Sequence, residues 1–459
     1  MNNSRGNFSS KLGLILASAG SAVGLGNLWR FPTETGQHGG SAFLIVYLIC
    51  VVCLGLPVMI SEFVIGRSAH VSVGRAYSVL APGSRWKWVG RLEVLTPFLI
   101  LCYYNVVAGW TLRYAWESAT GGFVKMASSG AGNAYESFFA SFVSSAWQPV
   151  VCLFLFMAAT HFVVVQGVSK GIERWSKVLM PGLFLILVFL VVSALTMSGA
   201  AEGLAFLFKP DFSKVDASVV LSAMGQAFFS LSLGMGILTT YASYFNDDAD
   251  LGKSALSISA IDTFVAILAG MFIFPAVFTA GVAPSEGSSL LFIALPNVFQ
   301  SVFGDLWILS YIVSLAFYLL LIVATLTSTI SIHEAVTSYL VESFEWSRRK
   351  AATIVSCLCG SIGVLCALSI GAVPELTIGE MSLFDAFDYV TAKWLLPMGG
   401  LFITLFAGWR LSKQILLSEM TNRGTKSFAL FKLLVFAIKW FCPVGIVLVF
   451  LNELDLLSF

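Results

Sequence analysis

Charged residues are scarce in this chain of 459 residues. They make up 11% of it, the net charge is +1, and only four histidines are present. With so little charge and no basic patch, the sequence gives no support for binding to nucleic acid. It also lacks low-complexity tracts, long linkers and a separate polar domain, so we expect one domain over residues 1–459.

The chain is instead rich in apolar residues, with 58% hydrophobic residues, 39 Phe and a mean hydropathy of +0.88. About 20 apolar residues in a helix cross a bilayer. The composition therefore predicts an all-α integral membrane protein. Eleven segments are long enough to be transmembrane helices: residues 11–36, 41–66, 89–116, 148–166, 174–198, 217–244, 254–281, 304–340, 350–370, 384–410 and 428–452.

The eight cysteines lie mostly in apolar runs. Packing is therefore a better interpretation than a redox pair, even for Cys50-Val-Val-Cys53. The stretch Ala17-Ser-Ala19 resembles a signal-peptidase site. Cleavage there would leave a chain that begins inside a glycine-rich stretch, so we interpret it as part of an uncleaved first span.

The basic residues predict the orientation in the membrane. With the N-terminus inside, the inner loops hold eighteen Lys and Arg residues, whereas the outer loops hold only Lys125, Lys209 and Lys214. Such an excess is typical of cytoplasmic loops. We therefore expect a multi-pass protein of the plasma (inner) membrane with a cytoplasmic N-terminus and, after an odd number of spans, an external C-terminus.

Glycines interrupt two of the apolar segments, at Gly20-Ser-Ala-Val-Gly-Leu-Gly-Asn27 and at Ser232-Leu-Gly-Met-Gly236. Unpaired backbone groups are tolerated inside a bilayer only where they meet an ion, a substrate or water. The breaks predict a secondary transporter built as a 5+5 inverted repeat, 1–200 and 201–412, with broken helices 1 and 6 and an additional transmembrane helix in 413–459. The alternative is that the glycines only permit close helix packing.

Four stretches at and near these breaks resemble the neurotransmitter:sodium symporter family: Gly24-Leu-Gly-Asn-Leu-Trp-Arg-Phe-Pro32, Gln226-Ala-Phe-Phe-Ser-Leu-Ser-Leu-Gly234, Tyr241-Ala-Ser-Tyr244 and Ala324-Thr-Leu-Thr-Ser328. The resemblance extends along almost the whole chain. It implies sodium-coupled import of an L-amino acid by alternating access. The family usually has twelve spans, and several bacterial members stop at eleven, as this chain does.

The resemblance implies a substrate site between the two breaks. The amides of Leu25 and Gly26, at the positive end of a half-helix, and the Tyr104 hydroxyl would hold the substrate carboxylate. Backbone carbonyls of Ala22, Phe229 and Ser230 would accept from its ammonium group. The implied substrate-binding residues are Ala22, Gly24, Leu25, Gly26, Ile100, Tyr104, Phe229, Ser230, Ser232, Met235, Ser328 and Ile332.

The residue at position 24 narrows the substrate class. Relatives that carry monoamines place an Asp where this chain has Gly24. Without that carboxylate the protein cannot pair the amine of such a substrate, so the substrate should bring its own. Neutral aliphatic and aromatic L-amino acids both fit the apolar pocket, and the sequence does not rank them.

The resemblance also implies two sodium ions, because hydroxyls and carbonyls are the hard ligands that such a cation needs. Without the family context, Thr327 and Ser328 would more often bond back to their own helix. Site 1 would use Ala22, Asn27, Ser230 and Asp262 together with the substrate carboxylate, and site 2 would use Gly20, Val23, Ala324, Thr327 and Ser328.

Asp262 predicts independence from chloride. An acid in the middle of a span is expensive and functional by default. Animal members of the family typically carry Asn at the matching position and bind chloride nearby, and a resident carboxylate can supply that negative charge. The alternative is a protonated Asp262 bonded to a neighbouring helix.

The resemblance implies two gates. Arg30 and Asp388, assisted by Gln226, would close the outer side, and Arg5, Glu342 and Tyr244 the inner side. The alternative for the inner charges is ordinary snorkelling at helix ends. The spacing of Gly171 and Pro181 favours unwinding of the fifth span at its cytoplasmic end.

Other classes fit less well. An ion channel would need a continuous filter. An enzyme is not expected, because His333-Glu334 lacks the second His of a zinc-binding motif and the glycines at 24–26 lack a dinucleotide-binding context. A substrate-sensing receptor of the same fold stays open. The expected partners are the amino acid, sodium and the lipid bilayer, and no obligate protein partner is implied.

Overall fold

The structure is a computed structural model that describes residues 6–128, 133–281, 290–302, 307–454 and 456. Arg5, which was predicted for the inner gate, lies outside the described residues. The first half of the chain forms these elements: α1 Lys11–Ala22, η1 Gly26–Arg30, α2 Phe31–Gln37, α3 Ser41–Cys50, η2 Val51–Gly55, α4 Leu56–Ala69, α5 Val73–Leu80, α6 Lys87–Ala119, α7 Gly122–Ser128, α8 Ala134–Val143, α9 Gln148–Val165, η3 Val168–Glu173 and α10 Arg174–Ala194.

The second half is also helical apart from one short antiparallel hairpin, in which Thr377 pairs with Ser382. Its elements are α11 Ala200–Phe208, η4 Phe212–Lys214, α12 Ala217–Ser230, α13 Ile237–Ala242, α14 Leu251–Ala280, η5 Leu290–Ala294, α15 Leu295–Val302, α16 Trp307–Phe344, α17 Arg348–Ser369, β1 Thr377–Ile378, β2 Met381–Ser382, α18 Leu383–Tyr389, η6 Val390–Leu395, α19 Leu396–Leu405, η7 Phe406–Arg410, α20 Lys413–Met420, α21 Phe431–Phe436, η8 Ala437–Phe441 and α22 Cys442–Glu453.

The helices confirm the predicted membrane architecture. Within the described ranges, nine helices are long and apolar enough to cross a membrane, and the pair Lys11–Ala22 and Gly26–Gln37, bent by 53°, makes a tenth. The remaining predicted span, 217–244, is divided between α12 and α13. Neither half is long enough to cross a bilayer alone, because residues 231–236 between them are not helical.

Polar side chains fix where several helices begin. Ser10 accepts from the amide of Gly13 at the start of α1, Asp216 accepts from Val219 at the start of α12, and Asp250 accepts from Lys253 at the start of α14. Each cap satisfies an amide that the first helical turn leaves unpaired.

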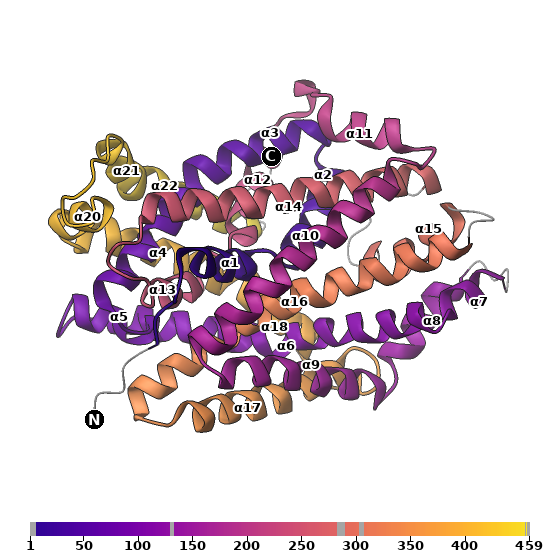
Figure 1. The fold of residues 1–459 in the computed structure, drawn as a ribbon, viewed down its shortest axis with the longest axis horizontal. Helices are drawn as coiled ribbons and strands as arrows, with labels where there is room; N and C mark the ends of the chain where they lie inside the picture. Colours follow the sequence, from indigo (N-terminus) through magenta and orange to yellow (C-terminus); the bar gives the residue numbers. More distant parts are fainter. Residues whose placement is uncertain (1–5, 129–132, 282–289, 303–306, 455, 457–459) are drawn as a thin grey trace.

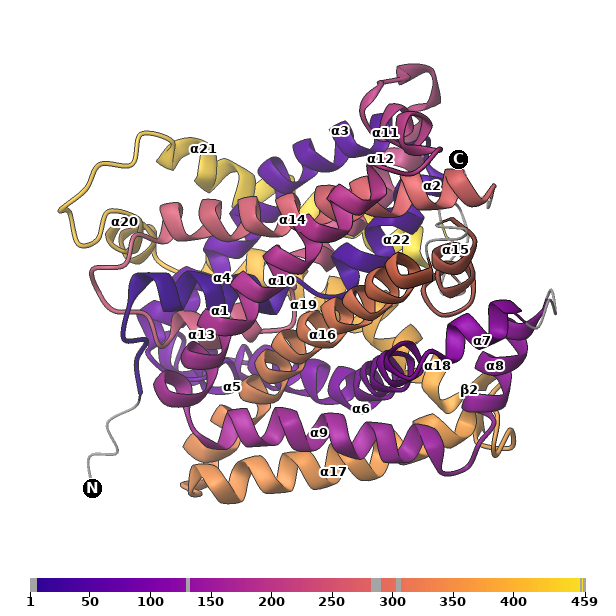
Figure 2. The ribbon, with the colours of Figure 1, turned by 45° about the vertical axis from the view of Figure 1, so that its right-hand side comes forward.

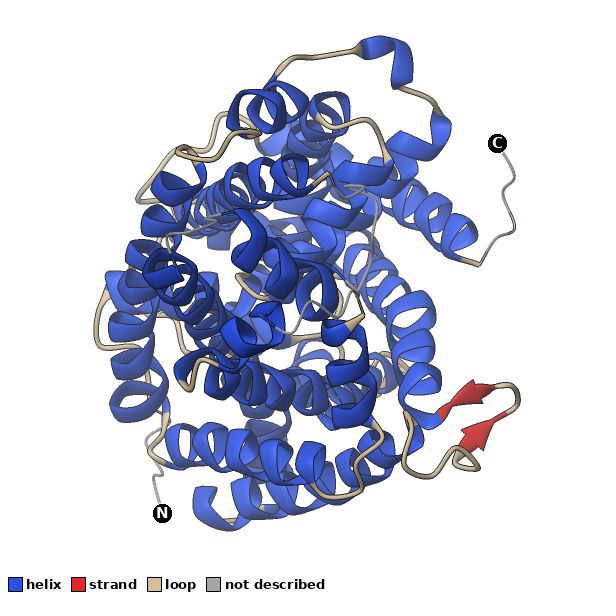
Figure 3. Cartoon of the chain, turned by 90° about the vertical axis from the view of Figure 1, so that its right-hand side faces the viewer, coloured by secondary structure: helices blue, strands red, loops and turns tan. Residues whose placement is uncertain are grey.

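The helices run between two ends of the molecule (Figures 1 and 2). One end carries α5, α13 and α20, and the other carries α7, α8 and α15. Figure 3 views the second of these ends, with the β1–β2 hairpin at the edge of the bundle. The first broken helix lies inside the bundle, where α1 packs against α10, α14 and α16. This arrangement places the break at residues 23–25 in the buried core.

Candidate functional site

At the first break, backbone groups at the centre of the bundle bond to side chains. Helix α1 ends at Ala22, Val23 is extended with ψ 108°, and helical structure resumes at Leu25. The amide of Gly24 donates to Oδ1 of Asn27 at 3.0 Å. The Tyr104 hydroxyl is hydrogen-bonded to the Leu25 amide and to Ser328. The break therefore presents its amides to the same point as Tyr104.

The second break depends on backbone conformations that favour glycine. Ser232, Gly234 and Gly236 have φ of 55°, 81° and 66°. A Cβ added at Gly234 would lie 2.4 Å from the carbonyl oxygen of Leu396, so this position has no room for a side chain.

A buried carboxylate holds the second break in place. Glu62 on α4 accepts from the amides of Gly234 and Thr239, at 2.9 and 3.1 Å, and from the Thr239 hydroxyl at 3.2 Å. It was not predicted as a site residue. The signal was present in the sequence, because an acid within a span is functional by default, as argued for Asp262.

A cavity lies between the two breaks. Eleven of the twelve predicted substrate-binding residues line it, and the twelfth, Ser230, is buried beside them. Tyr103, Ser21 and Leu396 also line the cavity and were not predicted. Tyr103 was detectable from sequence, since it lies three residues after Ile100 on one helical face.

Three residues of predicted sodium site 1 are in direct contact. Nδ2 of Asn27 donates to Oδ1 of Asp262 at 2.8 Å and to the Ser230 hydroxyl at 3.1 Å, and that hydroxyl donates to Oδ2 of Asp262 at 2.8 Å. Tyr47, which was not predicted, donates to the Ser230 hydroxyl at 3.5 Å. Asn27 and Asp262 are fully buried. Ser230 and Asp262 offer the oxygen ligands that a small hard cation prefers, whereas Asn27 directs its amide nitrogen toward them and its Oδ1 toward the Gly24 amide.

The residues of predicted sodium site 2 also lie together, where α1 faces α16. The Ser328 hydroxyl donates to the Val23 carbonyl at 3.3 Å, across the two helices. A Cβ on Gly20 would approach Thr327 to 3.3 Å. Thr327 donates at 2.9 Å to the carbonyl of Ala324 in its own helix, which is the local bond that its sequence position alone favours.

The charges predicted for the outer gate differ from the predicted pairing. Arg30 does not form an ion pair with Asp388 among the described residues; it pairs with Glu453 at 3.1 Å and with Glu34 at 3.5 Å. The guanidinium also lies 4.7 Å from the centre of the Phe229 ring. Asp388 is hydrogen-bonded to Tyr103 and close enough to Arg30 for electrostatic interaction.

The predicted gate residue Gln226 lies close to the first break. Its Nε2 donates to the carbonyl of Gly26 at 3.1 Å.

Two other clusters lie at the end that carries α5 and α13. The Tyr244 hydroxyl donates to Glu334 at 2.7 Å, and Glu334 in turn pairs with Arg348. Glu342 accepts from the amide and hydroxyl of Ser72 at 2.8 and 2.7 Å. Among the described residues, Tyr244 thus contacts Glu334 and Glu342 contacts Ser72. Glu334 and Arg348 were not predicted.

The segment expected to unwind is helical in this structure. Gly171 lies in the π-helical turn η3, and Pro181 lies inside α10. A Cβ on Gly171 would lie 2.2 Å from the carbonyl oxygen of Val163, so the glycine allows η3 to approach α9.

Comparison with known proteins agrees with this architecture. The sodium-dependent transporter YhdH of Bacillus subtilis (strain 168) is 38% identical over 454 residues, covering 98% of both chains. A sodium-dependent transporter of Haemophilus influenzae is 32% identical over 463 residues, covering 99% of both. The crystal structure of MhsT in complex with L-phenylalanine superposes with a TM-score of 0.87 at 42% identity, covering 98% of this chain and all of that one.

The model of the Sodium:neurotransmitter symporter family matches residues 5–127 and 135–458, which is almost the whole sequence. In this chain, a cavity lies between two broken helices, with buried oxygens beside it. This arrangement is the one expected of a transporter, not of an enzyme. The chain belongs to the sodium:neurotransmitter symporter family.

Proposed function

We propose that this chain imports a neutral, hydrophobic or aromatic L-amino acid together with two sodium ions, by alternating access and without chloride. One observation carries the proposal: the cavity lined by both breaks lies next to the buried Asn27–Ser230–Asp262 cluster. The amides of Leu25 and Gly26 and the Tyr104 hydroxyl offer donors to a carboxylate. Ile100, Ile332 and the other apolar lining residues suit an uncharged side chain.

The sodium ions are co-transported substrates in this proposal. One would bind to the oxygens of Asn27, Ser230 and Asp262, where the substrate carboxylate completes the site, so that ion and amino acid bind together. The other would bind between α1 and α16, at the Val23 carbonyl and the Ser328 hydroxyl. Each ion that enters supplies about 2.3 kcal/mol per 100 mV of membrane potential.

The relative MhsT, with its bound L-phenylalanine, supports an amino acid with an apolar side chain. Independence from chloride is supported by the hydrogen bonds that Asp262 accepts from Asn27 and Ser230 beside the proposed sodium site, because such donors favour its charged form. We further propose that α5, α13 and α20 face the cytoplasm, because the loops at that end hold most of the basic residues. The division into repeats 1–200 and 201–412 plus 413–459 is part of the same proposal.

Uptake into proteoliposomes tests the proposal. Purified full-length protein should accumulate labelled hydrophobic amino acids from a mixture when an inward sodium gradient is imposed. Equal accumulation with potassium in place of sodium would contradict sodium coupling. Binding without uptake would favour a substrate-sensing receptor, and flux that does not saturate with substrate would favour a channel.

A further inference from the structure

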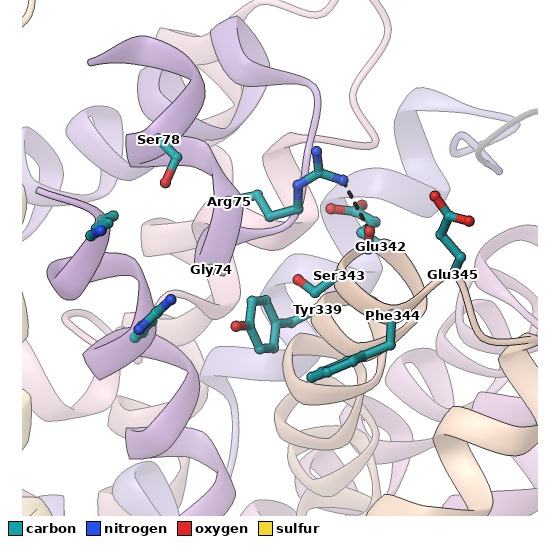
Figure 4. A pocket seen from close by; sticks show the side chains of 10 residues that line it. Gly74, Arg75, Ser78, Tyr339, Glu342, Ser343, Phe344 and Glu345 are labelled. Carbon is teal, nitrogen blue, oxygen red and sulfur yellow. Dashed lines mark hydrogen bonds between the residues drawn. The ribbon is translucent and has the colours of Figure 1, made fainter. Parts of the chain in front are cut away.

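A second cavity, of about 500 Å³, shares no lining residue with the proposed transport site (Figure 4). It lies between α5, the start of α6 and the end of α16. Gly74, Arg75 and Ser78 come from α5, Lys87 and Arg91 come from α6, and Tyr339 and Glu342 come from α16. On the orientation proposed above, which this inference uses, it faces the cytoplasmic edge of the membrane.

The lining of this cavity holds three basic and two acidic side chains, a formal excess of one positive charge. Arg75, Lys87 and Arg91 line it and are exposed. Of the two acids, Glu342 already accepts two hydrogen bonds from Ser72. Figure 4 shows Glu345 on the far side of Arg75 from Ser78, with its carboxylate directed away from Tyr339. The cavity therefore offers three cationic groups to an anion.

Hydroxyl groups complete the set of donors. Ser78 and Tyr339 line the same space, and Figure 4 shows both on the opposite side of Arg75 from Glu345. Arg75 itself is oriented by the hydrogen bond that its Nη1 donates to the backbone carbonyl of Glu342, at 3.0 Å. Guanidinium, ammonium and hydroxyl donors around one space match the oxygens of a phosphate group.

Apolar side chains on the same elements favour the phosphate of a lipid headgroup over free inorganic phosphate. Val79 on α5, Trp88 and Leu95 on α6 and Phe344 on α16 are each 46–58% exposed, and Trp88 is the most exposed of the four. The guanidinium of Arg91 lies 4.5 Å from the Trp88 ring. Exposed Trp beside Lys and Arg is typical of the headgroup level of a bilayer. The site would therefore take a phosphate that carries acyl chains.

We propose that this cavity binds the headgroup of an anionic phospholipid and joins α5, α6 and α16 through it. Basic pockets between transmembrane helices on the cytoplasmic side are suited to such headgroups. A zwitterionic lipid is a poorer ligand, because its own ammonium group offsets the negative charge of the phosphate to which the three basic residues are attracted.

Native mass spectrometry of the full-length protein in detergent, titrated with phosphatidylglycerol, tests this proposal. Lys87→Gln combined with Arg91→Gln should weaken binding of the tightest phosphatidylglycerol about 30-fold, taking ~1 kcal/mol for each basic residue. The charge-retaining pair Lys87→Arg and Arg91→Lys should preserve binding. The pair Arg349→Gln and Lys350→Gln, at the same end but outside the cavity, should also leave it unchanged.

Two further arms identify the source of the phosphate. Phosphatidylcholine should bind no more tightly to the wild type than to the glutamine pair, and millimolar inorganic phosphate should not displace phosphatidylglycerol. Displacement by inorganic phosphate, or equal phosphatidylglycerol affinity in the wild type and the glutamine pair, would overturn the proposal. Since this measurement does not involve uptake, its failure leaves the proposed transport function standing.

Discussion

At the scale of single residues, we expect Gly24 to limit which substrates the cavity accepts. A Cβ at this position would lie 2.6 Å from the Ser328 hydroxyl and 3.3 Å from the Tyr104 hydroxyl. Any side chain therefore intrudes on the proposed carboxylate site. Gly24→Asp adds a negative charge that repels the substrate carboxylate, whereas Gly24→Asn adds nearly the same volume without the charge.

We expect Gly24→Asp to abolish binding of neutral amino acids and Gly24→Asn to retain weak binding. Equilibrium binding of labelled substrate to the purified variants measures both. Ordinary affinity in Gly24→Asp would show that this break does not hold the carboxylate.

Asp262 gives a prediction about chloride. Two sodium ions beside one zwitterion need a compensating negative charge, and in a low-dielectric interior this matters by several kcal/mol. Wild-type uptake should be equal in chloride and gluconate. Asp262→Asn should lose most uptake and recover part of it when chloride is added. Uptake by the wild type that requires chloride, at constant sodium, would contradict this role.

Ser328 gives a prediction about sodium. Its hydroxyl points across to the Val23 carbonyl, so Ser328→Ala removes one oxygen from proposed site 2. The loss of a single ligand should raise the sodium concentration for half-maximal uptake about tenfold, taking ~1.4 kcal/mol for one hydrogen-bond-like contact. Ser338→Ala is the matched control, because this buried hydroxyl lies on the same helix and donates to Ala335. A similar change in both variants would argue against a specific site.

The resemblance placed Asn27 in sodium site 1, and Asp262 stood out as an acid inside a span. The structure brings the two into contact, while their binding of sodium stays a prediction. Glu62 is also an acid inside a span, yet it accepts from backbone amides that lie 172 and 177 residues away in the sequence. Which acid meets which break is decided by helix packing, and no local pattern encodes it.

At the scale of elements, Glu173 fastens the start of α1 to the segment that contains Gly171. It accepts from the amide and hydroxyl of Ser9, both at 2.7 Å, from the Ser10 hydroxyl at 2.8 Å and from Lys177 at 2.6 Å. Four donors to one carboxylate hold η3 in place. Loss of this contact should favour unwinding of the segment.

Glu173→Gln should therefore open this region more often. Removing the charge from this network costs about 1.5 kcal/mol, so deuterium exchange of amides 168–173 should become about tenfold faster. Glu136→Gln, an exposed acid on α8, is the control. Unchanged exchange in Glu173→Gln would show that the contact does not restrain the segment.

Element prediction succeeded for long apolar helices and was weaker at their interruptions. Length and hydropathy located the ten spans that the helices confirm. They could not predict π-helical turns such as η2 and η6, because these turns continue the apolar run. The break in 217–244 was found through its glycines, whereas the β1–β2 hairpin carries only two residues per strand and was not predicted.

At the scale of the whole molecule, the distribution of Lys and Arg predicts sidedness. Ser213, in the exposed loop after α11, should face outward, and Lys350, at the start of α17, should face the cytoplasm. In intact cells a membrane-impermeant maleimide should label Ser213→Cys and should label Lys350→Cys only after permeabilisation. The wild type, with its eight native cysteines, gives the background. The reverse pattern would invert the proposed orientation.

The assembled bundle also brings the last helix, α22, to a position that no sequence pattern predicts. Glu453, near the end of α22, reaches Arg30 beyond the first break, 423 residues away. A resemblance carried over residue by residue paired Arg30 with Asp388 instead. The difference arises because α22 lies outside both proposed repeats, so its position follows only from packing against the assembled bundle.

The two partners of Arg30 have a kinetic consequence. Glu34 lies one turn further along the same broken span and moves with Arg30, whereas Glu453 belongs to α22. If the outer side opens by separating these helices, only the second ion pair breaks, and the guanidinium keeps a carboxylate throughout. We therefore expect the last helix to act chiefly on the activation barrier for opening: it would set how fast the carrier cycles, while the ions and substrate set how far it concentrates its cargo.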